Sequence, residues 1–163
     1  MPNGKIVKLK SKQEMTVDLE LQIATNAKTL PHPAQFKEWV SVILANRINT
    51  NAELTIRIVD EEEIISLNYR YRNKNNSTNV LSFPVKLETH LDYNMLGDIV
   101  ICASVVELQA KQQNKVLLAH WAHMVVHGIL HLLGYDHENE LEANEMENLE
   151  IELMQQLGFL SPY

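Results

Sequence analysis

The sequence of 163 residues is poor in cysteine, glycine and proline, and it has no long apolar run. Its one cysteine, Cys102, cannot form a disulfide within the chain, which is typical of proteins from a reducing compartment. The lysine-bearing first residues contain no apolar segment of the kind found in secretory signals. No stretch approaches the roughly 20 apolar residues that a membrane-spanning helix requires. We therefore expect a cytoplasmic protein without a membrane partner.

Basic residues are also few, which limits the kinds of partner. Lys and Arg number 14 against 21 Asp and Glu, which gives a net charge of −7. Residues 1–74 carry a net charge of +2 and residues 75–163 a net charge of −9. Because nucleic-acid contact favours basic surfaces, we expect no DNA partner. A local basic strip of Arg70, Arg72 and Lys74 remains compatible with contact to a phosphate group.

The hydrophobic pattern predicts one α/β domain of the mixed (α+β) kind, without repeats or linkers. Strict alternation from Met15 to Ile23 predicts a half-buried strand. The expected architecture is a sheet of about four strands with about five helices, and with both parallel and antiparallel neighbours. The further strands are expected at residues 53–59, 79–85 and 97–102, and the helices at residues 33–49, after Asp60, and at 103–113, 116–133 and 138–157.

For two of these helices the sequence also predicts which residues cap the helix or face the core. Asp60 is expected to cap the helix whose first turn holds three glutamates. The last helix is expected to keep its acidic residues, Glu150 among them, on a solvated face. Its predicted inner stripe consists of Leu141, Met146, Leu149, Leu153 and Leu157.

The segment HGILHLLGYDH, residues 127–137, holds three histidines at the spacing of metal ligands. His127 and His131 are four residues apart and share one face of the central helix, which is zincin-like in this respect. Gly134 is suited to end that helix in a left-handed conformation, after which His137 can return to complete the site. Three imidazoles with an open fourth position are typical of a catalytic zinc. We therefore expect one Zn²⁺ per chain, although nickel and copper accept the same ligands.

Two more histidines lie on the same predicted helix. His123 and His131 are eight residues apart, which corresponds to about 12 Å along a helix axis and is too far for one metal with bonds of about 2 Å. We therefore interpret His120 and His123 as core or supporting histidines that are hydrogen-bonded.

The spacing is that of the zinc peptidase signature H-E-x-x-H-x-x-G-x-x-H, but Gly128 stands at the position of the catalytic glutamate. Asp136 is the nearest carboxylate in sequence, and it is either a base or partner of the site or the N-cap of the last helix. Phosphodiester cleavage depends less on a dedicated carboxylate, because a metal both acidifies water and stabilises charge on phosphate oxygens. A cation opposite the metal would assist, and on the residues alone Arg70, Arg72 and Lys74 are all candidates.

Three motifs together resemble the YbeY family of bacterial ribosomal RNA maturation endoribonucleases: HGILHLLGYDH, YRNKNNSTNVLSFP and LGDIVIC. The resemblance runs from about Val17 to the last residue, in the same order and spacing, and leaves residues 1–13 as a variable tail. It implies a zinc-dependent, single-strand-specific endoribonuclease in 3′-end maturation of small-subunit (16S) ribosomal RNA and in ribosome quality control. The implied partners are single-stranded ribosomal RNA and the ribosome or its small-subunit proteins.

The resemblance also implies roles for particular residues. The metal ligands of the family fall on His127, His131 and His137. Its functional arginine, in the pattern Y-R-x-K, falls on Arg72. The family often has Thr-Asp where this chain has Thr78-Asn79, and we expect no loss of function from this difference.

Two other functions remain open on the residues alone. A zinc peptidase-like hydrolase is disfavoured by Gly128. A ribosome-associated assembly factor would hold a structural metal, with Cys102 or a carboxylate closing the coordination.

Overall fold

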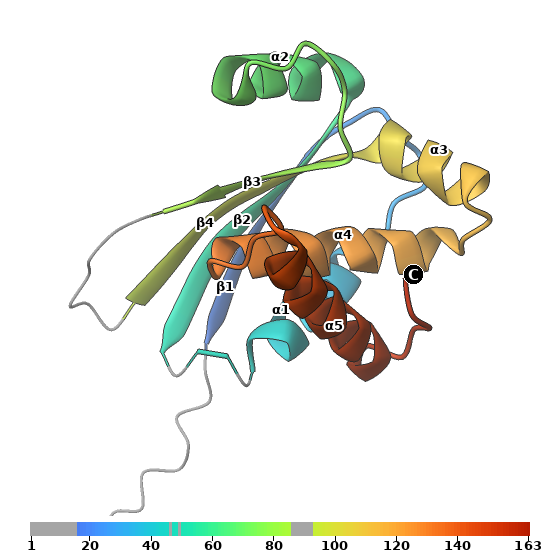
Figure 1. The fold of residues 1–163 in the computed structure, drawn as a ribbon. Coiled ribbons are helices and arrows are strands. Elements are labelled where there is room, and N and C mark those ends of the chain that lie inside the picture. The colour runs from blue at the N-terminus through green and yellow to red at the C-terminus, as the bar shows by residue number, and fades with distance from the viewer. Residues whose placement is uncertain (1–15, 46, 49, 86–92) are drawn as a thin grey trace, which may run out of the picture.

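Four strands form one mixed sheet (Figure 1). The computed structural model describes residues 16–163 except 46, 49 and 86–92, and its strands lie in the order β1-β2-β4-β3. β1 pairs parallel with β2 and β2 parallel with β4, whereas β3 pairs antiparallel with β4 at one edge. The predicted mixture of both kinds of pair is thus confirmed. The bounds are β1 (Val17–Ala24), β2 (Asn51–Val59), β3 (Val80–Pro84) and β4 (Tyr93–Cys102).

Five helices accompany the sheet in the described part of the chain, as predicted. Helices α1, α4 and α5 lie on one face of the sheet, α2 lies on the other, and α3 leads from the end of β4 into α4 (Figure 1). No helix among the described residues is long and apolar enough to span a bilayer. The bounds are α1 (Pro33–Leu44), α2 (Glu61–Arg72), α3 (Ala103–Gln112), α4 (Leu117–Leu132) and α5 (Glu140–Gln156).

Helix α4 is the central helix because apolar side chains surround it on nearly every side. It contacts β3 and β4 as well as helices α1, α3 and α5. The sheet meets it with alternate side chains of β2 and β4, since successive residues of a strand point to opposite faces. These buried side chains are Leu54, Ile56, Ile58, Ile99 and Ile101. The core therefore holds α4 in a defined position against the sheet.

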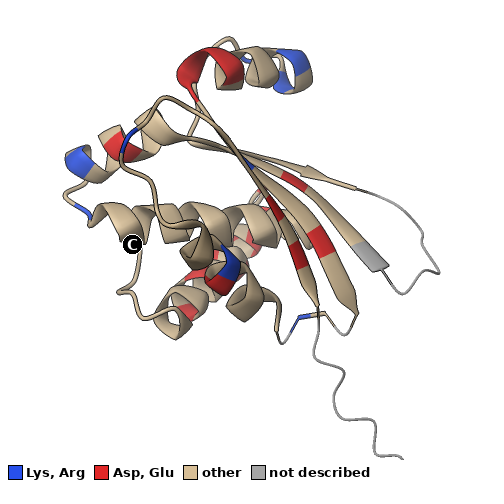
Figure 2. Cartoon of the chain, turned by 180° about the vertical axis from the view of Figure 1, so that it is seen from behind, with Lys and Arg blue, Asp and Glu red and all other residues tan. Residues whose placement is uncertain are grey.

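Helix α2 covers the opposite face of the sheet through a second and smaller apolar cluster. Ile64 of α2 packs there with Leu81 and Val100 from the strands, and all three side chains are buried. Three glutamates lie in the first turn of α2, and Arg70 and Arg72 lie in its last turn, as the red and blue ends in Figure 2 show. This order of charges favours the helix, because its dipole is positive at the first turn and negative at the last.

Several local details differ from the predictions. Asp60 is the N-cap residue of α2, as predicted, but its carboxylate makes no cap hydrogen bond and instead accepts from Thr25 and Asn26 after β1. Strand β4 begins before Gly97, which lies inside the strand at φ +133°, next to a shift in register with β2. Leu141, placed in the inner stripe of α5, is 80% exposed.

Candidate metal centre

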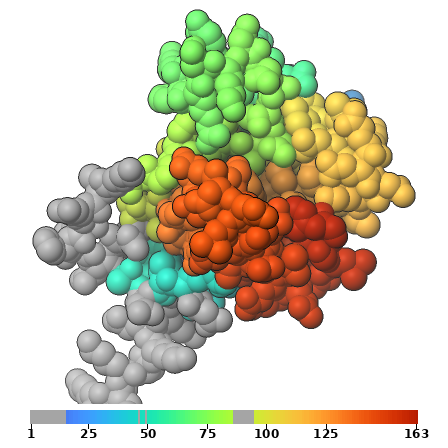
Figure 3. Space-filling model, viewed as in Figure 1, coloured from blue at the N-terminus to red at the C-terminus, as the bar shows by residue number. Residues whose placement is uncertain are grey.

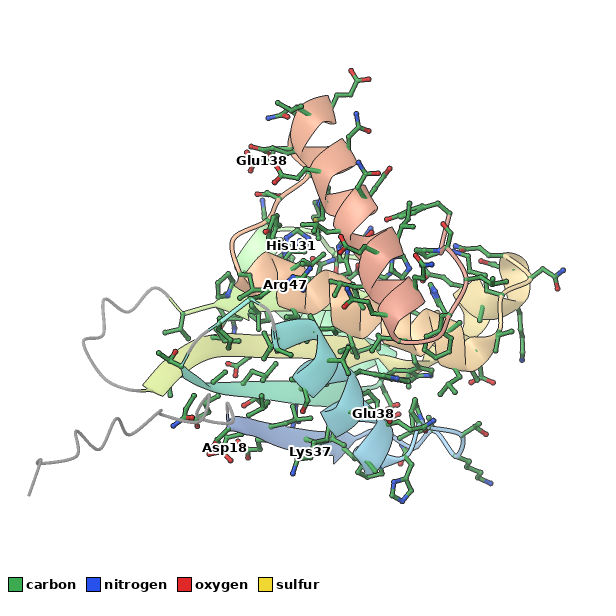
Figure 4. All side chains as sticks on the ribbon, turned by 90° about the horizontal axis from the view of Figure 1, so that it is seen from below. Asp18, Lys37, Glu38, Arg47, His131 and Glu138 are labelled. Atoms are coloured by element: carbon green, nitrogen blue, oxygen red, sulfur yellow. The ribbon has the colours of Figure 1, made fainter. Side chains whose placement is uncertain are left out.

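The fold brings His127, His131 and His137 together, although the three come from two different segments. His127 and His131 lie on the last turns of α4, and His137 lies in the loop before α5. One ligand atom from each histidine lies within 4.8 Å of the others. The two Nε2 atoms of His127 and His131 are 3.1 Å apart. Figure 4 shows His131 near the end of α4, beside the loop that carries Glu138.

The end of α4 directs the chain back toward the centre. Gly134 has φ +99°, the left-handed conformation expected from the sequence. Its backbone N–H donates to His131 O at 3.1 Å, and the N–H of Tyr135 donates to Leu130 O at 3.0 Å. These two hydrogen bonds satisfy carbonyls that would otherwise lack a partner at the end of the helix. The turn that they close lets His137 approach His127 and His131.

The three imidazoles fit a metal ion. Tetrahedral zinc with Zn–N bonds of about 2.0–2.1 Å separates two ligand nitrogens by about 3.3 Å, close to the spacing found here. Burial, assisted by the neighbouring His127 and His137, lowers the pKa of His131 to about 4. Its ring is therefore neutral at pH 7 and has a lone pair to offer. His137 is exposed, so the centre is open to solvent on one side.

Glu150 reaches the histidine cluster from α5, although it was predicted to lie on a solvated face. Its side chain is 1% exposed, not solvated, and its Oε1 atom accepts from Nδ1 of His127 at 2.5 Å. With the proton held on Nδ1, the Nε2 atom of His127 presents its lone pair toward His131. The sequence did indicate the buried position of Glu150, because it follows Met146 by four residues and precedes Leu153 by three, which places all three on one face of the helix. Met146 and Leu153 are both buried.

Three hydrogen bonds stabilise the charge of Glu150. Its Oε2 atom accepts from Nε2 of His123 at 3.3 Å and from the hydroxyl of Tyr163. Burial alone raises the pKa of this carboxyl, but the hydrogen bonds from His123, His127 and Tyr163 outweigh burial and bring the pKa below its ordinary value. A buried carboxylate is therefore present directly behind a candidate ligand. Such partners orient ligating histidines and increase their basicity.

Gly128 is needed for packing against the sheet. A Cβ atom at this position would lie 2.9 Å from Cγ2 and 3.0 Å from Cδ1 of Ile99 on β4. The carbonyl of Gly128 also accepts a hydrogen bond from the hydroxyl of Ser82 on β3, at 3.2 Å. A glutamate side chain at position 128 would thus begin inside the contact between α4 and the sheet.

The two predicted catalytic residues occupy different positions relative to the histidines. Asp136 adjoins the cluster: its Oδ1 atom accepts from the backbone N–H of His137 at 2.8 Å and lies 4.0 Å from Nδ1 of that residue. It does not cap α5, because Asn139 does so by accepting from the N–H of Glu142. Arg72 is exposed on the last turn of α2, and in the described part of the chain no hydrogen bond or ion pair joins it to the histidines.

The remaining candidates lie outside the cluster. His120 is 3% exposed, and its Nε2 atom lies 2.9 Å from Oε1 of Gln109 on α3. His123 bonds Glu150 and is not one of the three clustered histidines. Both are the buried, hydrogen-bonded histidines that we expected. Cys102 packs in the apolar cluster on the α2 side of the sheet, so it is not available to close the coordination.

These features define an α/β protein with a solvent-accessible cluster of three histidines that could hold one metal ion. A model of the endoribonuclease YbeY family matches residues 20–158. The chain therefore belongs to the YbeY family of endoribonucleases, and membership implies RNA hydrolysis in ribosomal RNA processing. Among solved structures, the solution structure of TM1509 from Thermotoga maritima is similar, with 29% sequence identity and a TM-score of 0.60. That match covers 84% of this chain and 88% of the other.

Proposed function

We propose that this chain is a zinc-dependent, single-strand-specific endoribonuclease acting in 3′-end maturation of 16S ribosomal RNA and in ribosome quality control. The observation that carries the proposal is the convergence of three imidazoles, one of them backed by the buried carboxylate of Glu150. Family membership supports RNA as the substrate. The place of action is then the cytoplasm, with the ribosome or its small-subunit proteins as partners.

In this proposal His127, His131 and His137 would hold the zinc, and the exposed His137 leaves the cluster open to solvent. When bound, zinc acidifies water and stabilises charge on the phosphate oxygens. Asp136, exposed beside His137, accepts the proton that the attacking group releases. Arg72 binds the scissile phosphate and stabilises the charge that develops on it.

The position of α2 supports the role of Arg72. The basic end of α2 and the C-terminal end of α4 lie toward the same side of the molecule, with β3 between them (Figures 1 and 2). In the space-filling view, α2 and the end of α4 with its following loop are exposed on one face (Figure 3). Arg72 is exposed and, within the described residues, has no carboxylate partner that would neutralise it. A strand of RNA crossing this face would contact both the basic end of α2 and the end of α4.

Two observations disfavour the alternative functions. A peptidase of the matching signature would need a glutamate at position 128, where Ile99 leaves no space for a side chain. An assembly factor with a structural metal would need a fourth protein ligand. Cys102 lies on the other side of the sheet, and the cluster in the described residues contains the three histidines alone.

The test is cleavage of single-stranded ribosomal RNA by purified, metal-analysed protein, with an unfolded protein as a second substrate. His127→Ala should lose the metal and the activity. Arg72→Ala should keep the metal and lose about 10²- to 10³-fold in kcat, because it removes one stabiliser of transition-state charge. Arg70→Ala is the matched control, since Arg70 is two residues away and therefore points to another side of α2.

The outcomes separate the three functions. Cleavage of RNA by the wild type and Arg70→Ala, with no cleavage by His127→Ala and much slower cleavage by Arg72→Ala, supports the ribonuclease. Equal activity in all four proteins would indicate a contaminating enzyme. Cleavage of the unfolded protein would support the peptidase. Bound zinc with neither substrate cut would favour the assembly factor.

A further inference from the structure

The segment after α5 folds back against the start of α4. The N–H of Phe159 donates to Met154 O at 2.9 Å, and the Phe159 ring packs edge-on against Trp39, with ring centroids 6.3 Å apart. Lys115, just before α4, donates from Nζ to Pro162 O at 2.6 Å. Residues 157–163 are thus attached to the body of the domain at both ends, and we call them the C-terminal strap.

The strap brings Tyr163 to the carboxylate that supports the metal centre. The Tyr163 hydroxyl donates to Oε2 of Glu150, while Oε1 of the same carboxylate accepts from His127. The Tyr163 ring lies edge-on to His123, with centroids 5.6 Å apart. A side chain 36 residues along the chain from His127 is therefore one carboxylate away from it.

We propose that Tyr163 is a positioning residue of the metal centre: its hydroxyl orients Glu150, and Glu150 orients the imidazole of His127. The inference rests on the proposed metal site, and it adds a function for the strap. In this role Tyr163 acts through Glu150 and supplies no ligand to the metal.

The geometry of Glu150 explains why the hydroxyl is needed. A carboxylate that bonds a ligand through one oxygen can still rotate about its last side-chain bond unless the other oxygen is held. Here the other oxygen is held by Tyr163 and by Nε2 of His123, and the His123 contact of 3.3 Å is long for an N–H···O hydrogen bond. Because Glu150 is 1% exposed, bulk water cannot readily replace a missing donor. The Tyr163 hydroxyl is therefore the stronger of the two supports.

If Tyr163 served only to pack against its neighbours, removal of its hydroxyl would have no effect on zinc binding. The Tyr163 ring also contacts His123, so a purely packing role would depend on the ring and not on the hydroxyl. Tyr163→Phe keeps the ring and removes the hydroxyl. It therefore separates the two roles with little risk to the fold.

The experiment measures the zinc dissociation constant by competition with a chromophoric chelator, and needs no RNA. Tyr163→Phe should bind zinc about three- to tenfold more weakly, less than the 10- to 100-fold typical of losing a direct supporting partner. Glu150→Met, a side chain of similar length without an acceptor, should show that larger loss. Tyr69→Phe is the matched control, because Tyr69 is 59% exposed on α2 and its hydroxyl has no partner among the described residues.

The double variant gives the decisive comparison. If Tyr163 acts through Glu150, adding Tyr163→Phe to Glu150→Met should leave the zinc dissociation constant within about twofold of Glu150→Met alone. In the metal-free protein, long-range ¹H–¹⁵N NMR should show the Nδ1–H tautomer of His127 in the wild type and a mixture of tautomers in Tyr163→Phe. This second readout does not depend on the stability of any metal complex.

Unchanged or tighter zinc binding by Tyr163→Phe would overturn the inference, as would losses that add in the double variant. Wild-type protein that binds zinc and shows this coupling but leaves RNA intact would refute the proposed ribonuclease and keep the inference. Wild-type protein that binds no zinc would refute both.

Discussion

At the scale of single residues, the candidate metal centre is backed by a carboxylate that is not among its three clustered histidines. Glu150 holds the proton of His127 on Nδ1, and burial keeps His131 neutral at pH 7. Both effects leave an imidazole lone pair free, which is the state that a metal requires. The third histidine, His137, is exposed, so it gives the centre an open side.

Asp136→Asn tests whether this exposed carboxylate accepts a proton in the reaction. The amide keeps the oxygen that accepts from the N–H of His137 but cannot take up a proton at neutral pH. We expect kcat for RNA cleavage to fall by about 10²- to 10⁴-fold, with KM and zinc content unchanged. Loss of zinc in this variant would instead indicate a role in holding His137. Full activity would exclude Asp136 as the base.

We predict that the burial of His120 makes the stability of the metal-free protein depend on pH. Burial, with smaller effects from His123 and Lys115, lowers the pKa of His120 from 6.5 to about 4. Between these values the unfolded chain binds a proton that the folded chain does not, so stability decreases as pH falls from about 6.5 to 4. One proton corresponds to about 1.4 kcal/mol per pH unit.

The measurement is urea unfolding at several pH values for the wild type and for His120→Gln, whose amide can still donate to Gln109. The variant should lose the share of the slope that one proton contributes. Identical slopes for the two proteins would show that His120 does not titrate in this range.

At the scale of elements, the close packing of α4 against the sheet determines which residue can occupy position 128 beside the histidines. Gly128 faces Ile99 at a distance that admits no Cβ without a shift. The same helix presents His127 and His131 on a different side. Since consecutive residues of a helix are about 100° apart, packing on one side and metal binding on another are compatible.

Gly128→Glu, which restores the peptidase signature, should therefore destabilise the protein and not create a protease. Overpacking a core commonly costs about 1–3 kcal/mol, and an unpaired buried charge adds to this cost. We expect a drop in the free energy of unfolding of about 3 kcal/mol or more, measured by urea or thermal unfolding. Gln112→Glu on the exposed end of α3 adds a similar charge and should change stability little. A stable Gly128→Glu protein that cleaves unfolded protein would contradict this view.

At the scale of the whole molecule, the candidate metal centre and its hydrogen-bond partners link α4, the loop before α5, α5 itself and the C-terminal strap. The histidines belong to the first two, Glu150 to α5 and Tyr163 to the strap. A metal bound only by the folded chain stabilises it by mass action, about 2.7 kcal/mol at a free concentration of 100 times the dissociation constant.

Chelation should accordingly lower the thermal midpoint. For a chain of this size, 1 kcal/mol corresponds to about 2–4 °C, so removal of zinc from such a solution should lower Tm by about 5–10 °C. Differential scanning calorimetry with and without chelator measures the change. His127→Ala should have a lower Tm that no longer responds to the chelator. A chelator effect that persisted in this variant would place the metal elsewhere.

The sequence by itself determined the class of fold and which three histidines come together. Hydrophobic periods identified the four strands and five helices, because burial on one face of a helix or strand leaves a local repeat. The three histidines were predictable because helix spacing and a helix-ending glycine act within eleven residues. The family motifs pointed to Arg72, whose catalytic role stays a prediction.

Only the tertiary structure decided which polar residues support those ligands. Asp60 was predicted to cap α2 and Glu150 to face solvent, yet Asp60 bonds the segment after β1, and Glu150 bonds His123, His127 and Tyr163. Helix and cap propensities depend only on the position of a residue within its own element. The environment of a carboxylate is set by whichever distant element packs over it. In the same way the sequence displayed Gly128 in place of a glutamate, and the reason for it, the side chain of Ile99, comes from a strand 29 residues earlier in the chain.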